Sequence, residues 1–584
     1  MPIDRGLKAV WTPRGVADRS LPLVERVLAA RGILGEEAAA FCAPSLAGLH
    51  DPSAIPDLDR AAERLLDAAR GVEPIVIYGD YDVDGITATC ILYHMLRELA
   101  PDADVRTYVP HRLDEGYGLN GSAIEQLAAD GARVIVSVDC GVTAIEPAAR
   151  ARALGVDLII TDHHNPPESD ADLPDAFAVV HPRRPGSAYP FGELCGAGVA
   201  YKLAWRLATL ACGSERVSPE LRELLVDLLA PAALGAIADV VPLVDENRVI
   251  TRFGLTRVKP SRFEGLRALV EASGLADDTI DAMAVGFRLA PRLNACGRMG
   301  HARDAVELFT TATGSRARSI AEMLCQLNDE RRATERRIVD QAAAMAEDAG
   351  MTGEDRRAIV LAHPDWHPGV IGIVCSRLVE KYHRPVILLG DQGDTLTGSA
   401  RSVPGFNLHA AIGACNELLT KFGGHDMAAG LTLPASNLDA FIEGFTEHVN
   451  GEIAPEDLVG RVSYDCEADL SELTPDAVKQ LEALAPFGAG NPSVRLRVRA
   501  RLTTPPETFG KTGNHLSLRL RDAAMTGPVL RTVAWRWADQ ASSFASGTDV
   551  DTVISPRLSR WNGRVNVEPE LVDAAAARAP AVTP

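Results

Sequence analysis

The segment Pro74-Ile-Val-Ile-Tyr-Gly-Asp-Tyr-Asp-Val-Asp-Gly85 decides how this chain is interpreted. It opens with a short apolar run typical of a buried strand, and three aspartates follow at alternate positions, Asp80, Asp82 and Asp84. In an extended segment, alternate side chains point to one face. Carboxylates about 4 Å apart repel by about 4 kcal/mol at an effective dielectric of about 20, and a divalent cation turns that repulsion into attraction. The segment therefore predicts a metal site, with an acidic turn or the first turn of a helix as the alternative.

Two more strand-like runs end in potential metal ligands. Residues 133–138 precede Asp139, and residues 156–160 precede Thr161-Asp-His-His164. Helical patterns separate these runs, and a strand–helix alternation of this kind predicts a parallel sheet with right-handed crossovers. Ligands of such sheets collect beyond the carboxyl ends of the strands. We therefore expect the three acidic or His-bearing segments at one edge of one sheet.

The ligand types indicate which metal. Several aspartates with one or two imidazoles and no thiolate pair suit Mn²⁺ or Mg²⁺ better than structural zinc. The candidate ligands also outnumber what one ion needs. This surplus predicts two ions, an arrangement that clamps the attacking and leaving oxygens of phosphoryl transfer.

Together these segments resemble the DHH phosphoesterase superfamily, and most closely its branch of single-strand-specific 5′→3′ DNA exonucleases. The resemblance extends from about residue 60 to about residue 570. Further matching segments are 117–120, 194–198, 236–240, 288–301, 366–372, 398–402 and 422–430.

The resemblance implies roles for individual residues. The implied metal ligands are Asp82, Asp84, Asp139, His163 and Asp239. His164 is implied to face the scissile phosphate, and Asp80 is implied to be either a ligand or a residue directly behind the ligands. Arg288, Asn294 and Arg298 are implied to order the site or to bind phosphate. The residues implied to hold a terminal 5′-phosphate are Arg112, Ser399, Arg401 and His425.

Two positions depart from the family pattern. Ala400 stands where the family usually has glycine, and Cys296 stands where it usually has alanine. Glycine permits a closer approach of backbone to a ligand than alanine does. We therefore expect Ala400 to narrow the phosphate pocket slightly.

The net charge of −20 argues at first sight against nucleic acid, but the charge is unevenly distributed. Residues 491–570 hold twelve Arg and Lys against seven Asp and Glu. Strand-like alternation there, with aromatic residues beside arginines, fits an OB-fold that stacks bases. An ordinary barrel with a solvated basic face is the alternative, and the resemblance favours the OB-fold. The nucleic-acid-binding candidates are Arg519, Trp535, Arg560 and Trp561.

The predicted fold class is α/β, with two α/β lobes joined by a long helix and followed by a C-terminal β-barrel. The expected parts are a helical N-terminal lead-in (1–70), a DHH phosphoesterase domain with a parallel sheet (71–245), a linker motif and long connecting helix (246–350), a DHH-associated domain (351–455), an OB-fold (456–572) and a disordered tail (573–584).

Composition and sequence patterns indicate the cellular location of the protein. Apolar residues make up 46% of the chain, there is no run of about 18 apolar residues, and the N-terminus lacks a signal-peptide pattern. The ten scattered cysteines form no Cys-x-x-Cys pair, which argues against a disulfide framework and a zinc ribbon. We expect a cytoplasmic monomer with no membrane partner.

The predicted activity is metal-dependent hydrolysis of single-stranded DNA from its 5′ end to 5′-mononucleotides, in repair and recombination. By resemblance, a single-strand binding protein and a helicase are the implied protein partners. The alternatives are a DHH phosphodiesterase of short oligoribonucleotides or cyclic dinucleotides, a non-catalytic scaffold and an inorganic pyrophosphatase. The basic C-terminal stretch argues against the first and third, and the filled ligand positions argue against the second.

Overall fold

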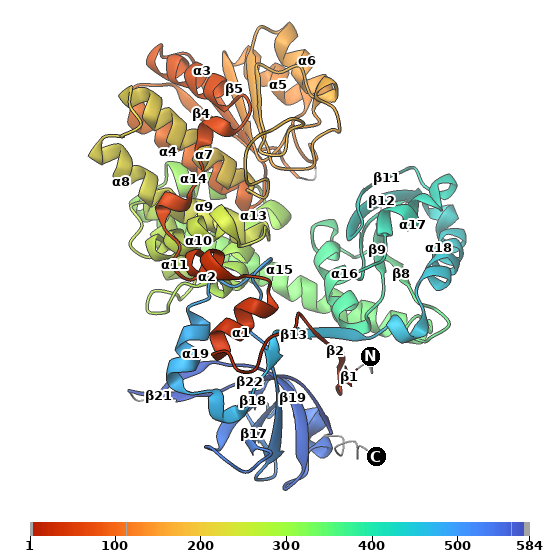
Figure 1. Cartoon of the computed structure of the whole chain (residues 1–584). Coiled ribbons are helices and arrows are strands. Elements are labelled where there is room, and N and C mark those ends of the chain that lie inside the picture. The colour runs from red at the N-terminus through yellow and green to blue at the C-terminus, as the bar shows by residue number, and fades with distance from the viewer. Residues whose placement is uncertain (1–3, 113, 392, 562, 577–584) are drawn as a thin grey trace. The chain divides into compact units, whose positions relative to one another are not determined.

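A computed structural model describes residues 4–112, 114–391, 393–561 and 563–576, without the side chains of Asp4, Trp561 and Ala576 (Figure 1). The chain divides into two compact units, which are described one at a time. The first unit comprises Ala43–Arg332 and Ala485–Pro492. The second comprises Met1–Cys42, Ala333–Leu484 and Ser493–Pro584.

A five-stranded parallel sheet forms the centre of the first unit. Its order is β4 (Val105–Tyr108), β3 (Ile75–Gly79), β5 (Val134–Val138), β6 (Asp157–Thr161) and β7 (Ala178–Val180). One face packs against α3 (Leu58–Arg70), α4 (Val83–Leu99) and α7 (Gly196–Cys212), and the other against α5 (Gly121–Ala129) and α6 (Ile145–Ala153). Helix α9 (Leu229–Ala238) packs on α4 and α7. The predicted parallel sheet is confirmed.

The strand order creates a switch point between β3 and β5. From β3 the chain crosses first to β4 on one side and then to β5 on the other. Crossover helices on opposite faces separate at such a point and leave a crevice beyond the carboxyl ends of the strands. The acidic segments after β3 and β5 both begin there.

The acidic segment itself differs from expectation. It is not extended, because β3 ends at Gly79 and α4 begins at Val83, with Asp82 as the helix N-cap. Asp84 therefore lies in the first turn of α4. A Cβ on Gly85 would lie 2.6 Å from the backbone nitrogen of Asp80, so glycine is needed for a turn this tight. The segment is the start of a helix, so the extended alternation is wrong, but the helix start does not replace the predicted metal site, because the same carboxylates belong to groups that could hold a metal ion.

The second unit contains a mixed sheet of five strands. Its order is β11 (Lys421–His425), β12 (Ala428–Pro434), β10 (Thr395–Arg401), β9 (Val386–Asp391) and β8 (Ile359–His363), and only the β8–β9 pair is parallel. Helices α17 (Leu408–Gly413) and α18 (Leu438–Glu452) cover its apolar face. Helix α16 (Pro368–Tyr382) packs on β9 and β10.

The predicted long helix is confirmed as α15 (Gly314–Asp348), and the division between the two units falls within it. The predicted barrel is also confirmed. Strands β15 (Leu496–Leu502), β19 (Asp549–Ser555), β22 (Glu570–Ala576), β18 (Leu530–Ala534) and β17 (His515–Asp522) pair in that order, and β17 pairs back to β15. A hairpin of β20 (Leu558–Trp561) and β21 (Arg564–Val567) lies between β19 and β22 in the chain.

Two predicted boundaries are corrected. The lead-in is not wholly helical, because β2 (Ala9–Pro13) pairs in parallel with β13 (Gly460–Tyr464). The indole of Trp11 is buried and donates to Asp573 Oδ2 at 2.8 Å. Asp573 is fully buried within β22, so the tail predicted from residue 573 is ordered strand up to Ala576. Residues 577–584 lie outside the described part of the chain.

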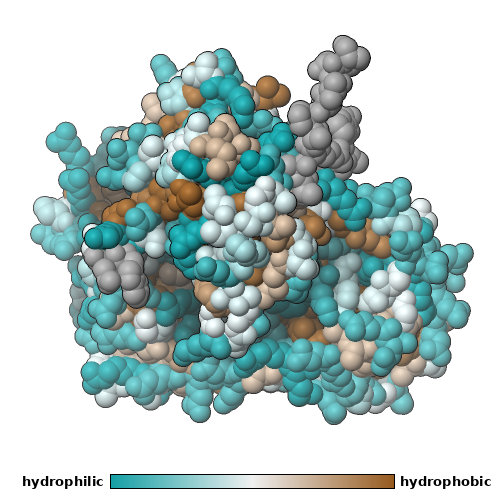
Figure 2. Space-filling model, turned by 90° about the horizontal axis from the view of Figure 1, so that it is seen from below, coloured by the Kyte–Doolittle hydropathy of each residue, from teal (hydrophilic) through white to brown (hydrophobic). Residues whose placement is uncertain are grey.

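The face of the protein in Figure 2 is mostly hydrophilic, and its hydrophobic residues form small, separate patches. Among the described helices, none combines the length and apolar character that crossing a membrane requires.

Candidate metal centre

Asp80 and Asp82 lie in the turn between β3 and α4. The Asp82 carboxylate caps α4 by accepting from the backbone N–H groups of Asp84 at 2.9 Å and Gly85 at 3.2 Å. The Asp80 side chain is buried, and its Oδ1 has no hydrogen-bond partner among the described residues. The turn thus holds one constrained carboxylate and one buried carboxylate with an oxygen that lacks a donor.

Asp84 is fixed by the start of another helix. Its two oxygens accept from the backbone N–H groups of Gly196 at 2.6 Å and Ala197 at 2.9 Å, at the N-terminus of α7. A Cβ on Gly196 would lie 2.6 Å from Asp139 Oδ1, so this glycine lets α7 approach the cluster. The segment 194–198, noted in the sequence, therefore positions two carboxylates.

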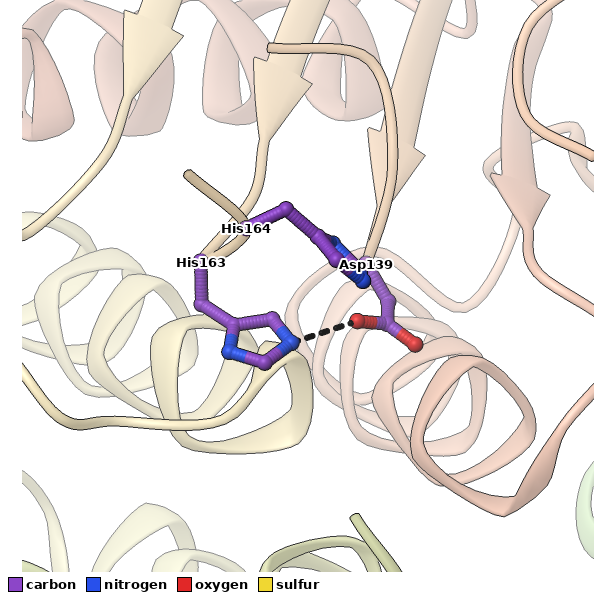
Figure 3. Close-up of side chains that lie close together, drawn as sticks. All are labelled: Asp139, His163 and His164. Atoms are coloured by element: carbon purple, nitrogen blue, oxygen red, sulfur yellow. Dashed lines mark ion pairs between the residues drawn. The ribbon is translucent and has the colours of Figure 1, made fainter. Parts of the chain in front are cut away.

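Asp139 and His163 meet beyond β5 and β6, as Figure 3 shows. His163 Nε2 lies 3.2 Å from Asp139 Oδ1. Both atoms are buried, and neither makes a hydrogen bond of good geometry within the described residues. Asp139 also has a left-handed backbone, with φ of 63°, a conformation that costs energy for a residue other than glycine.

Asp239 completes the cluster from the C-terminal end of α9. His163 Nε2 lies 3.5 Å from Asp239 Oδ2 and 3.8 Å from Asp84 Oδ2. The potential ligand atoms form three groups, each with its atoms within 4.8 Å of one another. These groups are Asp80–Asp82–Asp139, Asp84–His163–Asp239 and Asp139–His163–His164. Asp139 thus links the turn after β3 to the histidines after β6.

The electrostatics of the cluster call for a cation. Burial and then the neighbouring Asp82 raise the pKa of Asp80 to about 8. Burial and then Asp84 raise the pKa of Asp239 to about 8, and the same two causes raise the pKa of Asp139 well above its usual range. Clustered carboxylates, with Oδ1 of Asp80 and of Asp139 buried and without a hydrogen-bond partner among the described residues, form with the imidazole of His163 a hard, oxygen-rich donor set that fits Mn²⁺ or Mg²⁺.

His164 is held differently from His163. Asp162 Oδ1 lies 2.7 Å from His164 Nδ1 and accepts from the backbone N–H groups of both histidines. Burial lowers the pKa of His164, but the hydrogen bond and charge of Asp162 outweigh it and raise the pKa to about 9. Burial disfavours ionisation of Asp162, yet its bonds with His164 hold its pKa at about 2. Asp162 therefore positions His164, a role that the sequence analysis missed.

The structure distributes the predicted arginines and Asn294 around this edge. Asn294 Oδ1 accepts from the backbone N–H of Val83 at 3.2 Å and so helps to fix the start of α4. The Arg112 guanidinium lies 4.8 Å from the ring centroid of Tyr81. Arg298 is half-buried on α13 (Ala290–Met299).

Arg288 lies on a π-helical turn, Val285–Leu289. Its guanidinium binds Asp278 Oδ2 at 2.7 Å and the carbonyls of Ser273 and Gly274 at 2.9 and 3.1 Å. These contacts order the 273–278 loop rather than bring Arg288 into the carboxylate cluster.

The predicted phosphate pocket lies in the second unit. Ser399 and Arg401 point to the same face of β10, against α16, where a Cβ on Gly372 would lie 3.4 Å from Ser399 Oγ and 3.2 Å from Arg401 Nη2. Arg401 and His425 are both in register with Ala428, so their side chains share a face of the sheet.

The expectation for Ala400 is wrong. Its side chain is fully buried in the core beneath α17 and α18, on the face opposite Ser399 and Arg401. It therefore cannot narrow the pocket. Cys296 is likewise buried, and its thiol donates to the carbonyl of His301 at 2.8 Å.

The barrel presents an aromatic cluster on β16 (Glu507–Phe509), β17 and the end of β18. The rings of Phe509, His515 and Trp535 have centroids 4.9–5.6 Å apart, and Trp535 is half exposed. Arg519 and Arg560 are exposed, whereas the side chain of Trp561 lies outside the described part. Many other arginines pair with acidic residues, as Arg531 does with Glu568, which offsets part of the local positive charge.

Comparison with known proteins places this arrangement in a family. Three family models match: "DHH family, N-terminal domain" over residues 74–232, "DHHA1 domain" over 355–451 and "RecJ OB domain" over 464–573. The single-stranded-DNA-specific exonuclease RecJ of Dickeya dadantii is 37% identical over 563 residues, covering 94% of this chain and 95% of that protein. The chain belongs to the RecJ family.

RecJ structures share the fold. The crystal structure of Thermus thermophilus RecJ in complex with Mn²⁺ matches with a TM-score of 0.79 at 30% identity, over 97% of this chain and 80% of that one. The complex of the same protein with Mg²⁺ matches with a TM-score of 0.74 at 29% identity, over 97% and 79%. Both ions belong to the class that the donor set here fits.

Proposed function

We propose that this chain is a metal-dependent exonuclease specific for single-stranded DNA, which it degrades from the 5′ end to 5′-mononucleotides during repair and recombination. The observation that carries the proposal is the position of Asp139. It lies at the sheet's switch point and belongs to two groups of potential ligands, in a chain that also matches the DHHA1 and RecJ OB domain models.

The ligand groups would bind two metal ions. Asp84, Asp139, His163 and Asp239 would hold one, and Asp80, Asp82 and Asp139 would hold the other, with the Asp139 carboxylate shared. Divalent ions bound there would supply an activated water and neutralise charge that develops on the phosphate. Mn²⁺ and Mg²⁺ are the proposed ions.

The surrounding side chains prepare the site for a phosphodiester. Asp162 holds His164 through Nδ1, so Nε2 is left to face the scissile phosphate. The raised pKa of His164, which Asp162 maintains against burial, keeps its imidazole cationic at neutral pH. A cation at that point favours an anionic substrate and stabilises the charge of the transition state. Asn294 keeps the start of α4, and with it Asp82 and Asp84, in place.

A second anion site would hold the terminal 5′-phosphate. Ser399 and Arg401 lie beside the first turns of α16, a fifteen-residue helix whose N-cap is His367. Backbone N–H groups and the helix dipole favour anions at such an end, and a nearby arginine adds a bidentate donor. We assign His425, on the same face of the sheet, to this pocket as well. Arg112 and Arg298 in the first unit remain candidates for phosphate contacts.

The barrel would hold the single strand. In OB-folds the face of the second and third strands and the loop between the fourth and fifth bind oligonucleotides. Here the corresponding strands are β17 and β18. Strand β17 carries Arg519 and His515, and the ring of His515 packs with Phe509 of β16 and with Trp535 at the end of β18. The hairpin with Arg560 and Trp561 occupies the loop between β19 and β22. Exposed aromatic faces beside arginines suit sequence-independent stacking.

The test is end-resolved degradation of a single-stranded DNA oligonucleotide labelled at its 3′ end. The reactions contain Mn²⁺, Mg²⁺ or chelator, with a matched duplex and a matched RNA beside them. The proposal expects metal-dependent shortening from the 5′ end, confined to the DNA single strand. Rapid cleavage of dinucleotides or cyclic dinucleotides without cleavage of long DNA would contradict it and favour the small-substrate branch of the DHH superfamily.

A further inference from the structure

The segment Tyr117-Gly-Leu-Asn120 was noted in the sequence, but the proposed function gives it no role. It lies in the loop between β4 and α5, at the carboxyl edge of the sheet. Asn120 caps α5 by accepting from the backbone N–H of Ala123 at 2.7 Å. Leu119 is buried in the core beneath α5 and α6. The structure of the loop therefore accounts for these residues, but not for Tyr117.

Tyr117 is exposed although it borders a buried cluster. Its side chain is 54% exposed. Glycines at 116 and 118 flank it with φ of 84° and 82°, a left-handed conformation that glycine adopts without strain. The Tyr78 hydroxyl donates to the carbonyl of Gly118 at 3.0 Å and so anchors the loop on β3. The backbone is thus built to project one aromatic side chain over the edge of the sheet.

The hydroxyl of Tyr117 lies against the imidazole ring of His164. It is 3.1 Å from Nε2, 3.3 Å from Nδ1 and 3.4 Å from the carbonyl oxygen of Asp139. An oxygen at similar distances from both ring nitrogens lies over the ring face and not along the Nε2–H direction. Asp162 accepts from His164 Nδ1, so Nε2 is the nitrogen left for the substrate. The tyrosine O–H donates to the Asp139 carbonyl, so this hydroxyl connects the imidazole to the backbone of Asp139.

Neighbouring aromatic and basic groups hold the Tyr117 ring. The ring is edge-to-face with His164, at a centroid distance of 5.7 Å, and with Tyr81, at 6.2 Å. Tyr81 in turn lies beneath the Arg112 guanidinium. The row from Arg112 to His164 crosses the sheet edge above the proposed metal site, where a phosphodiester would bind.

We propose that Tyr117 positions the imidazole of His164 for the scissile phosphate, with its hydroxyl set against the ring beside both nitrogens. This contact limits rotation of the ring about its bond to Asp162 and leaves the Nε2–H direction open. With the strand bound, a phosphate oxygen accepts from the Nε2–H. Tyr117 remains bonded to the Asp139 carbonyl and limits movement of the ring. This inference rests on the proposed function of His164.

The test compares Tyr117→Phe with Tyr108→Phe. Tyr117→Phe keeps the ring and removes the hydroxyl. The control removes another hydroxyl that stabilises the same loop, through Glu115, but does not reach His164. We expect Tyr117→Phe to lower kcat about tenfold, which corresponds to about one hydrogen bond, because the imidazole is held less firmly in the transition state. KM, thermal stability and metal requirement should be unchanged. Tyr108→Phe should leave kcat within about twofold of wild type.

A double-variant cycle separates action through His164 from an independent effect. In a His164→Gln background, measured with enzyme in excess over substrate, Tyr117→Phe should cause no further loss, because the group it positions is gone. Losses that multiply, a kcat for Tyr117→Phe equal to wild type, or a KM that rises while kcat is unchanged would each overturn the proposal. Wild-type turnover of the same strand is measured in parallel, so failure of the exonuclease function itself would be recognised separately.

Discussion

Replacement of Asp139 by asparagine should stabilise the metal-free protein and at the same time remove its response to metal. Oxygens of Asp80, Asp82 and Asp139 lie within 4.8 Å of one another. Two unit charges at that separation repel by about 3.5 kcal/mol at an effective dielectric of about 20. A neutral amide of the same shape removes this repulsion at the residue that both ligand groups share.

The size of the gain depends on pH, because protonation relieves the same repulsion in the wild type. Burial and neighbouring carboxylates raise the pKa of Asp139 well above its usual range, and burial and Asp82 raise the pKa of Asp80 to about 8. Such groups bind more protons in the folded protein than in the unfolded chain. The metal-free wild type therefore loses stability as pH rises from about 4 towards 8. Asparagine does not contribute to that loss, so the difference between variant and wild type should grow with pH.

The assay is thermal unfolding in chelator and in Mn²⁺, at pH 6 and pH 9. In chelator at pH 9 we expect Asp139→Asn to be more stable than wild type by about 1–3 kcal/mol, the part of the repulsion that protonation no longer relieves. Saturating Mn²⁺ should raise wild-type stability by about 2.7 kcal/mol at one hundred times its dissociation constant. The variant should lack that increase, and it should lack hydrolysis.

Asp162→Asn is the matched control, because it alters a buried aspartate at the same sheet edge with the opposite electrostatics. Bonds with His164 hold the pKa of Asp162 at about 2 against the effect of burial. Its contribution to stability is therefore present above about pH 4 and is lost as pH falls towards 2. The control should be destabilised throughout pH 6–9. An Asp139→Asn variant that is less stable than wild type in chelator at pH 9, or that keeps the Mn²⁺ response and turnover, would refute the reasoning.

Three further predictions concern other parts of the molecule. Arg401→Ala should reduce the ratio of kcat/KM for 5′-phosphorylated over 5′-hydroxyl strands, and an unchanged ratio would contradict the proposed pocket. Trp535→Ala should weaken binding of long single strands by about 1–3 kcal/mol, the value of one stacked base, while cleavage of very short strands is retained; equal losses on both substrates would make the barrel a structural element. Lys202→Ala should cost about 3–5 kcal/mol in unfolding free energy, because it leaves the carboxylate of Glu246 buried without its cation. Recovery of stability on adding Glu246→Gln would confirm that cause, and a loss below about 1 kcal/mol would contradict it.

The position of the cluster could be predicted from the sequence because it depends on local order. Short, mainly apolar runs, each followed within two residues by Asp, specify strand ends, and parallel strands bring those ends together. The path after the first strand could not be predicted by alternation. The turn at Gly85 and the capping carboxylate of Asp82 start α4 at once, so Asp84 reaches the cluster from a helix.

Contacts between distant segments were beyond the sequence patterns. No sequence pattern near Trp11 or Asp573 indicates that their side chains form a hydrogen bond. Only the tertiary structure brings the first strands next to the last one. The face of the sheet on which the Ala400 side chain lies depends on the register of β10. The short motif around Ala400 does not reveal that register. Asp162 was part of a recognised motif, but its contacts with His164, rather than its residue type, define its role.

The most direct test of the central claim is an anomalous difference map of crystals of the protein grown with Mn²⁺. The proposal predicts two manganese peaks, both coordinated by the carboxylate of Asp139, one with His163 and the other with Asp80 and Asp82. A single peak away from Asp139, or full occupancy of both positions in an Asp139→Asn variant, would contradict it.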